Sequence, residues 1–377
     1  MTQDLTFIGK NIRFFRRSSN WTLARLASKI NIQEGPLGRI ERGENLPSAT
    51  VIYNLTQALN VPADALFAPD LSRARAAATE IDAVLVAIDE SEPIPPKPLL
   101  SACRKLMSAF HALEDILGVQ KYALIPLSIP FEPDYAGMEQ LAARIRTAMG
   151  TGDAVVFDYL ELFENFGLRV VLFPFMKAAD DFDGISFFES FHQNAFFFIN
   201  SKRTPEKQLF SLIKELGKIL IFSQMSIRKD ILFPKSVSTS VARPITPTRA
   251  AKHFAATFLA PQSAVEATVH QLGITPATWT WDLILRIKHR FGISTEAFVY
   301  RLLELNLITK DLCDSLINHI KKYYSRTGFG EPNDSRRILN ANGRFFDLLL
   351  TAGRDEASRK EIKKINAMVE ELKLVKI

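Results

Sequence analysis

The first 69 residues contain five short segments with the apolar spacing of helices, and this succession constrains the fold of the chain most. Ile8, Ile12 and Phe15 lie on one face of the first segment. Thr22 is a candidate N-cap for the second segment, and the turn "NIQ" leads directly into a third at roughly 33–41. Two short helices joined by so tight a turn are typical of a helix-turn-helix unit.

The composition is that of a globular protein long enough for two or three domains, with 377 residues, 47% of them hydrophobic and 23% charged. No apolar run approaches the roughly 20 residues that cross a bilayer, and the first residues lack the apolar core of a signal peptide. The two cysteines, Cys103 and Cys313, show no disulfide pattern. These features predict a cytoplasmic protein without a membrane segment.

The net charge of +6 is concentrated in residues 1–69 and 320–377. A basic terminal segment is a common mark of nucleic-acid contact, and an ordinary solvated surface produces the same composition. Charge alone therefore leaves both interpretations open.

The N-terminal segment, from "IGKNIRFF" to "ALNVPADALF", resembles the lambda-repressor-like (XRE) helix-turn-helix family along its whole length. The matching motifs are Leu26-Ala27, "RIERG" at 39–43, Pro47-Ser48 and "ALNVPADALF" at 58–67. The resemblance implies a DNA-binding transcriptional regulator whose recognition helix enters the major groove.

The resemblance also assigns roles to individual residues. Base-facing positions fall to Gln33, Glu34, Gly35 and Arg39, and backbone-anchoring positions to Lys10, Arg13 and Arg42. Arg39 is suited to guanine, and Gln33 to adenine or a phosphate. Gly35 and Pro36 offer no side chain that reads a base, which keeps open a helix-turn-helix that grips protein instead.

Regulators of this type usually reach two half-sites with two copies, so we expect a homodimer on an inverted repeat of double-stranded DNA. An apolar repeat at three and four residues near the C-terminus consists of Ile362, Ile365, Val369 and Leu372. This repeat fits a short coiled coil between copies and equally fits packing onto a neighbouring domain. The arm between the domains is the other candidate for the dimer interface.

A long apolar segment, "LFSLIKELGKILIF" at 209–222, has the frame of the zinc motif H-E-x-x-H with lysine at both histidine positions. The frame residues are Lys214, Glu215 and Lys218. Zinc needs lone pairs from imidazole, thiolate or carboxylate, and a lysine ammonium has none. We therefore expect no metal and no other cofactor. The runs "LRVVLFPF", "GISFF" and "NAFFFIN" before this segment predict the strands of a small sheet that packs against it.

Residues 136–310, with "DGIS", "INSKRTPEKQLFSLIKELGKILI" and "AAKHFAATFLAP", resemble the ImmA/IrrE-type zinc metallopeptidase domain. In that family the long helix supplies two histidine ligands and a glutamate base, and an acidic third ligand precedes the later helix. Lys214 and Lys218 stand at the histidine positions and Glu215 at the base position. The acidic position falls near Thr248, Arg249 and Ala250. The resemblance thus implies a degenerate domain, a pseudoenzyme that has lost all three zinc ligands.

Two interpretations of Lys214, Glu215 and Lys218 stay open. They form an ion-paired structural cluster, or they line a pocket whose fixed positive charge holds an anionic ligand or a protein partner. The apolar residues around them predict that the lysines point inward.

We therefore predict a mainly α protein with a small β-sheet. Its parts are a helix-turn-helix domain at 1–69, a helical linker at 70–135 with a helix over 71–88, a degenerate, zincin-like α+β metallopeptidase-like domain at 136–310, and a helical C-terminal extension at 311–377. The predicted function is sequence-specific transcriptional regulation, with the degenerate domain as a sensor or partner-binding module. The alternatives are a protein-binding antitoxin or adaptor, and a zinc peptidase that cleaves a repressor.

Overall fold

The chain forms two compact units in the computed structural model. The first comprises Met1–Leu85 and Phe187–Asn194, and the second comprises Val86–Ser186 and Ala195–Ile377. The residues that the structure describes are 6–18, 21–59, 61, 63–69, 83–190, 192–228, 245–328, 330–332, 339, 342–354 and 358–374.

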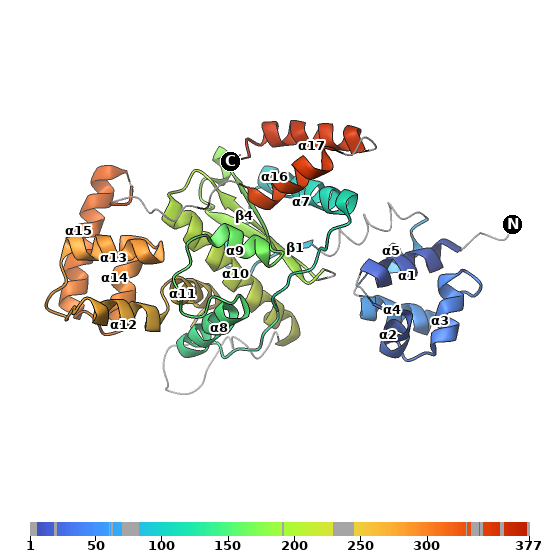
Figure 1. Cartoon of the computed structure of the whole chain (residues 1–377), viewed down its shortest axis with the longest axis horizontal. Helices are drawn as coiled ribbons and strands as arrows, with labels where there is room; N and C mark the ends of the chain where they lie inside the picture. The colour runs from blue at the N-terminus through green and yellow to red at the C-terminus, as the bar shows by residue number, and fades with distance from the viewer. Residues whose placement is uncertain are drawn as a thin grey trace. The chain divides into compact units, whose positions relative to one another are not determined.

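Five short helices make up most of the first unit (Figure 1): α1 (Thr6–Ser18), α2 (Leu23–Lys29), α3 (Glu34–Glu41), α4 (Ala49–Leu59) and α5 (Ala63–Phe67). Thr22, the predicted N-cap, accepts a hydrogen bond from the backbone N–H of Arg25 at 3.1 Å. Asn31 turns the chain between α2 and α3 with a φ of 56°, in the left-handed region that asparagine tolerates. The predicted succession of short helices is therefore confirmed.

The core of the first unit is a single apolar cluster. It contains the predicted stripe of α1 together with apolar side chains from the other helices: Ile8, Ile12, Phe15, Leu26, Leu37, Leu55 and Leu66. Helices this short are marginal in isolation, so their stability comes from burying these stripes against one another.

The second unit contains most of the sheet and twelve helical segments among its described residues. Its elements, with β1 of the first unit, are β1 (Ala83–Leu85), α7 (Lys97–Leu117), α8 (Tyr135–Ala148), α9 (Tyr159–Asn165), β2 (Arg169–Phe173), the short 3-10 helix η1 (Lys177–Ala179), β3 (Gly184–Glu189), β4 (Asn194–Asn200), α10 (Pro205–Arg228), α11 (Pro247–Leu259), α12 (Gln262–Gln271), α13 (Trp281–Phe291), α14 (Thr295–Glu304), α15 (Lys310–Thr327), α16 (Gly343–Ala352) and α17 (Arg359–Glu371).

The sheet has four strands in the order β1-β3-β4-β2. β1 pairs antiparallel with β3, with Val84 opposite Phe188, and β2 pairs parallel with β4, with Val171 opposite Phe198. Every residue of β2, β3 and β4 is buried. Burial on both faces explains why these strands read as continuous aromatic and β-branched runs, and the predicted small sheet is confirmed.

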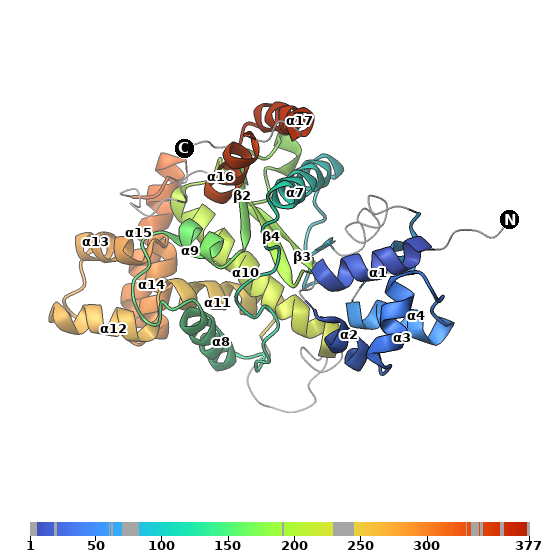
Figure 2. The same cartoon turned by 45° about the vertical axis from the view of Figure 1, so that its right-hand side comes forward.

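Helices cover both faces of the sheet in the second unit. On one face, Phe110 of α7 meets Phe196 of β4 edge-on with ring centroids 5.7 Å apart. On the other, Phe163 of α9 meets Phe197 at 5.5 Å. Neighbouring strand residues point to opposite faces, so these two contacts define two helical layers. α7, α16 and α17 lie together on one side of the unit, and α12 to α15 gather at one end (Figures 1 and 2).

The prediction of a helix over 71–88 was wrong at its C-terminal end. Ala83–Leu85 form strand β1, which adds to the edge of the sheet beside β3. The alanine content favours a helix, but the run Val84 to Val86 fits a pleated, half-buried edge better. The remainder of that predicted helix, 71–82, lies outside the described residues. Among the described helices, none combines the length and apolar character that a membrane crossing requires.

Candidate functional site

Contacts at two places hold α3 against α1 in the first unit. Arg16 forms a buried, two-pronged ion pair with Glu41, with Nε at 2.5 Å from Oε1 and Nη2 at 2.8 Å from Oε2. Gly9 lets the two helix backbones touch, because a Cβ at this position would lie 2.2 Å from the carbonyl oxygen of Ile40. The inner face of α3 is thereby fixed, and its outer face is free to contact another molecule.

The four predicted base-facing residues lie together on that outer face. Gln33, Glu34, Gly35 and Arg39 are all exposed. Gln33 occupies the N-cap position of α3 and makes no capping bond with its side chain, so its amide is available to an external partner. Base contact by these residues stays a prediction.

The predicted backbone anchors lie at the periphery of the same unit. Lys10 and Arg13 are exposed on α1. The Nε of Arg42 lies 2.5 Å from Oε1 of Glu44, and both side chains are about half exposed. Surface ion pairs of this kind contribute little to stability, so the pair with Glu44 does not exclude a phosphate contact by Arg42, and that contact stays a prediction.

In the second unit, the lysine-bearing frame of α10 forms a compact charged group. Lys218 is buried, with Nζ at 2.7 Å from Oε2 of Glu92 and 3.4 Å from Oε2 of Glu215. Glu215 is fully buried, and its Oε2 also accepts a hydrogen bond from the Ser186 hydroxyl of β3 at 2.7 Å. The Nζ of Lys214 lies 3.6 Å from Oε1 of Glu215. We call Lys214, Glu215, Lys218 and Glu92 the α10 cluster.

The surroundings of Lys218 keep it charged. Burial lowers the pKa of its ammonium, but Glu215 and Glu92 raise it by more, and the pKa lies above its ordinary value. The prediction that the lysines point inward holds for Lys218, while Lys214 is only partly buried.

A short segment that follows β1 brings Glu92 to α10. Val86 continues the sheet by donating its N–H to the Ser186 carbonyl at 2.9 Å. The Ile88 N–H then binds Oε1 of Glu92 at 3.0 Å, which leaves Oε2 for Lys218. Thr248, at the predicted acidic position of α11, donates its hydroxyl to Asp89 of this segment at 3.4 Å. The segment thus supplies carboxylates to both α10 and α11.

A cavity of about 830 Å³ lies beside Lys214, bounded by α10, α11, α14 and α15. Its lining includes Lys214, Lys252, Lys321, Phe210, Tyr300 and Tyr324. In the part of the chain that the structure describes, Lys252 and Lys321 belong to no ion pair, whereas the lining carboxylate Asp183 lies 2.6 Å from Arg203.

A buried network underlies this cavity. Lys288 is fully buried, with Nζ at 3.4 Å from Glu206 and 3.0 Å from Glu331. Glu331 also accepts hydrogen bonds from the Thr295 hydroxyl at 2.9 Å and from the Tyr324 hydroxyl. Burial and the bond to Glu331 raise the pKa of Tyr324 well above its ordinary value, so the phenol stays protonated. Two of the carboxylates that line the cavity therefore have partners: Glu206 pairs with Lys288, and Glu331 pairs with Lys288 and accepts hydrogen bonds from Thr295 and Tyr324.

Comparison with known proteins decides the class of the first unit. Residues 12–66 match the family model described as helix-turn-helix. Over 62 residues the chain is 40% identical to the uncharacterised HTH-type transcriptional regulator YazB of Bacillus subtilis, and the match covers 16% of this chain and 90% of that protein. The chain belongs to the XRE-type helix-turn-helix transcriptional regulators.

A second relative supports this assignment at lower identity and over a smaller share of its own length. The regulator is 30% identical over 66 residues to the HTH-type transcriptional regulator SutR of Escherichia coli, which covers 18% of this chain and 37% of that protein. Residues 163–303 match the IrrE N-terminal-like domain, a peptidase family model, so the second unit contains a domain of this family. No solved structure matches the chain.

The residues present in the α10 cluster do not fit the zinc ion that the IrrE-type family implies. An ammonium, the Nζ of Lys218, lies between the carboxylates of Glu92 and Glu215, and it has no lone pair for a metal. His253 of α11 has Nδ1 at 3.7 Å from Glu304 and its ring at 4.9 Å from that of Tyr135, while its buried Nε2 has no hydrogen-bond partner among the described residues. One imidazole does not make a zinc site.

Sequence reasoning missed Glu92, the residue that completes the cluster. Glu92 lies 126 positions before Lys218, in a proline-rich segment assigned to the linker and to no chemistry. No spacing rule connects a loop carboxylate to a helix so far along the chain. Only a lysine predicted to be buried, which requires a counter-charge, signals that such a residue exists.

Proposed function

We propose that this regulator reads a specific DNA sequence with α3, and that its IrrE-type domain works without zinc as a sensor of a ligand or a protein partner. Exposed Gln33 and Arg39 supply the side chains that discriminate bases, and Lys10, Arg13 and Arg42 contact the phosphates. The helix-turn-helix match supports the DNA-binding part of this proposal.

The observation that carries the proposal is the position of the Lys218 ammonium, 2.7 Å from Glu92 and 3.4 Å from Glu215. Its positive charge offsets the carboxylates that a metal would otherwise neutralise. A metallopeptidase needs an activated water on a Lewis acid, and this cluster offers neither. Glu215, the residue at the base position, already accepts hydrogen bonds from Ser186 and is paired with Lys218.

The cavity beside Lys214 gives the domain a place to bind a signal. Four lysines from α10, α11 and α15 line it: Lys207, Lys214, Lys252 and Lys321. Four carboxylates line it as well, of which Asp183 lies near Arg203 and Lys207, and Glu206 and Glu331 lie near Lys288. Aromatic and hydroxyl side chains complete the lining, a combination suited to a small anionic molecule or to an acidic side chain of a partner. Binding there would alter DNA binding by shifting the arrangement of two copies on their half-sites.

Zinc analysis of the purified full-length protein tests the metal-free part of the proposal. The protein is produced with added zinc, and its zinc content is measured by mass spectrometry beside that of a Glu215→Ala variant. We expect the two proteins to hold the same amount. One equivalent of zinc that disappears with Glu215 would show that the α10 cluster is a metal site and would restore the peptidase alternative.

The sensor part is tested by transcription from the operator in cells. A folded Lys214→Gln/Lys252→Gln protein should bind the operator as the wild type does, yet lose its response to the inducing condition. Arg249→Gln, an exposed change on α11 outside the cavity lining, serves as the matched control. An unchanged response in the double variant would refute the sensor assignment.

A further inference from the structure

The cavity beside Lys214 contains charged groups of both signs that are not used inside the protein. Three of its four carboxylates have cationic partners: Asp183, Glu206 and Glu331. Glu296 of α14 is the fourth, and it belongs to no ion pair among the described residues. The exposed lysines Lys252 and Lys321 likewise belong to none among them. A ligand that complements this cavity therefore carries anionic groups for two lysines and hydrogen-bond donors for one carboxylate.

The unpaired carboxylate lies next to an aromatic ring. Glu296 and Tyr300 are four residues apart on α14, so they share one face of the helix, and both line the cavity. Tyr300 is 44% exposed, which leaves part of its ring open to a ligand. Burial and the charge of Glu296 raise the pKa of the Tyr300 phenol, so the carboxylate lies near the ring and the phenol stays protonated. A flat ligand ring stacked on Tyr300 would have its edge beside Glu296.

The hydrogen-bonding capacity of a carboxylate selects among the flat rings that could stack there. A carboxylate only accepts hydrogen bonds, and its two oxygens suit two donors side by side. The Watson–Crick edge of guanine presents such a pair, N1–H and the 2-amino group. Adenine and cytosine present one amino group beside an acceptor, and uracil presents one N–H between two carbonyl groups. Glu296 therefore fits guanine better than the other bases.

The cations of the cavity suit the other end of a nucleotide. Lys214, Lys252 and Lys321 come from α10, α11 and α15, so positive charge reaches the cavity from three helices. A lysine ammonium is a compact charge that binds phosphate without a fixed orientation. The volume of about 830 Å³ lies in the range of pockets that enclose ligands much larger than a lone phosphate.

We propose that this cavity binds a guanine nucleotide, with the base stacked on Tyr300 and hydrogen-bonded to Glu296, and the phosphates held by Lys252 and Lys321. The inference deepens the proposed function and rests on it for the consequence of binding, because it names the ligand of the sensor site. Base and phosphates are recognised by different residues, so the two contributions can be measured separately.

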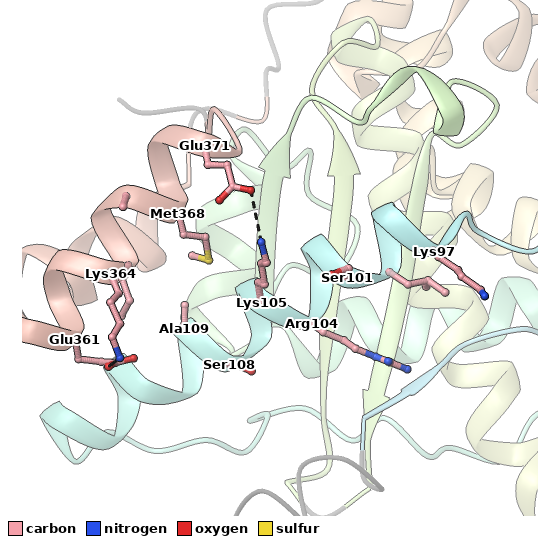
Figure 3. Close-up of a pocket in the computed structure, with 13 residues that line it drawn as sticks. Lys97, Ser101, Arg104, Lys105, Ser108, Ala109, Glu361, Lys364, Met368 and Glu371 are labelled. Carbon is pink, nitrogen blue, oxygen red and sulfur yellow. Dashed lines mark hydrogen bonds and ion pairs between the residues drawn. The ribbon is translucent and has the colours of Figure 1, made fainter.

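A second groove, of about 940 Å³, lies between α7 and α17 and lacks this combination (Figure 3). The apolar stripe of α17 is buried within the chain, which favours packing onto a neighbouring domain over a coiled coil. Lys97 and Arg104 line the groove and belong to no ion pair among the described residues. Its carboxylates, Glu361 and Glu371, each pair with a lysine, and no aromatic side chain is among the described residues that line it. Arg104 therefore provides a control cation outside the proposed site.

Isothermal titration calorimetry of the full-length protein without DNA tests recognition of the base. The probes are guanosine diphosphate (GDP) and inosine diphosphate (IDP), which differ only in the 2-amino group, with adenosine diphosphate (ADP) as a third. We expect the wild type to bind GDP about tenfold more tightly than IDP, the usual discrimination by a two-pronged hydrogen bond, and ADP more weakly than GDP. Glu296→Gln should lower the affinity for GDP about tenfold and abolish the preference over IDP.

The phosphate contacts are tested by comparing GDP with guanosine monophosphate (GMP). The wild type should bind GDP more tightly than GMP, because the second phosphate adds charge beside the lysines. Lys252→Gln/Lys321→Gln should remove this difference and keep the preference for GDP over IDP. Arg104→Gln should leave all four affinities unchanged. If circular dichroism shows that Glu296→Gln does not fold, Tyr300→Ala replaces it and should weaken GDP and IDP alike through lost stacking.

Several results would overturn the proposal. They are no GDP binding by the wild type at millimolar concentration, equal affinity for GDP and ADP, unchanged GDP affinity in Glu296→Gln, or weaker binding in Arg104→Gln. The sensor assignment is judged separately, by the response of Lys214→Gln/Lys252→Gln in cells. If that response is lost while GDP does not bind, the nucleotide is rejected and the sensor assignment stands.

Discussion

At the scale of single residues, the buried charge of Lys218 and the charges of Glu92 and Glu215 compensate one another. Lys218→Ala leaves Glu92 and Glu215 in a buried environment without the ammonium that lies 2.7 Å and 3.4 Å from them. Removing one partner of a buried ion pair costs about 3–5 kcal/mol, so we expect a loss of stability of that order. Urea denaturation of the two proteins measures it.

Exchanging the three most buried members of the α10 cluster tests whether Lys218 and its carboxylates form a buried structural group. Lys218→Met combined with Glu92→Gln and Glu215→Gln should recover most of the loss, because the charge that is left without a partner, on Lys214, is partly exposed to water. Lys310→Ala, at an exposed pair, is the control and should leave the unfolding midpoint unchanged. If Lys218→Ala proves as harmless as this control, the cluster is hydrated and the burial argument fails.

The buried carboxyl of Glu164 should make the free energy of unfolding depend on pH. Burial raises the pKa of its carboxyl from 4.5 to about 7, the backbone N–H of Arg344 opposes the shift, and Asp347 adds to it. The folded state then holds a proton between pH 4.5 and 7 that the unfolded state releases, so stability falls as the pH rises through that window. Glu164→Gln should flatten this slope and stabilise the protein at pH 8 by up to about 3 kcal/mol. The free energy of unfolding is measured by urea denaturation between pH 4.5 and 8 for both proteins. If it falls equally steeply with pH in the wild type and the variant, Glu164 is not the group responsible.

At the scale of elements, the contact of α1 with α3 depends on a missing side chain. Gly9→Ala places a Cβ 2.2 Å from the Ile40 carbonyl oxygen, so the helices have to separate. We expect a loss of about 1–3 kcal/mol, the usual cost of overpacking. Trp21 fluorescence reports unfolding of this unit once Trp279 and Trp281, the other two tryptophans, are changed to phenylalanine.

Gly35 provides the matched control within the same pair of helices. It lies in α3 with nothing within 4 Å of an added Cβ. Gly35→Ala should therefore be neutral or stabilise the unit by up to about 1 kcal/mol through helix propensity alone. Equal effects of the two substitutions would show that α1 and α3 do not touch as described.

Some elements of the fold follow from local sequence signals, and others depend on contacts with distant parts of the chain. α3 and β4 follow from local signals, a tight turn with apolar periodicity and an aromatic run ending in Asn200. β1 could not be predicted, because its three residues become a strand only by pairing with β3. The contact of Glu92 with Lys218 could not be predicted for the same reason, because it forms only once hydrogen bonds of Val86 and Ile88 position this segment.

At the scale of the whole molecule, the chain contains two domains of known families, a helix-turn-helix at residues 12–66 and an IrrE-type domain at residues 163–303. Both were visible in the sequence as motifs. The charge balance of the α10 cluster was visible only in part, because Lys214, Glu215 and Lys218 were apparent in the sequence and Glu92 was not. On the proposed function, a ligand that binds in the cavity beside Lys214 should change the affinity of the protein for its operator.

Selection of bound duplexes from a random DNA pool by the full-length protein, at near-physiological salt, tests the central claim of sequence-specific binding. We predict enrichment of an inverted repeat, with enrichment lost in Arg39→Ala and binding weakened about equally on all sequences in Lys10→Ala. Lys29→Ala, an exposed lysine with no predicted DNA contact, is the control. Binding that is salt-sensitive but blind to sequence, and unaffected by Arg39→Ala, would contradict the claim and favour the protein-binding alternative.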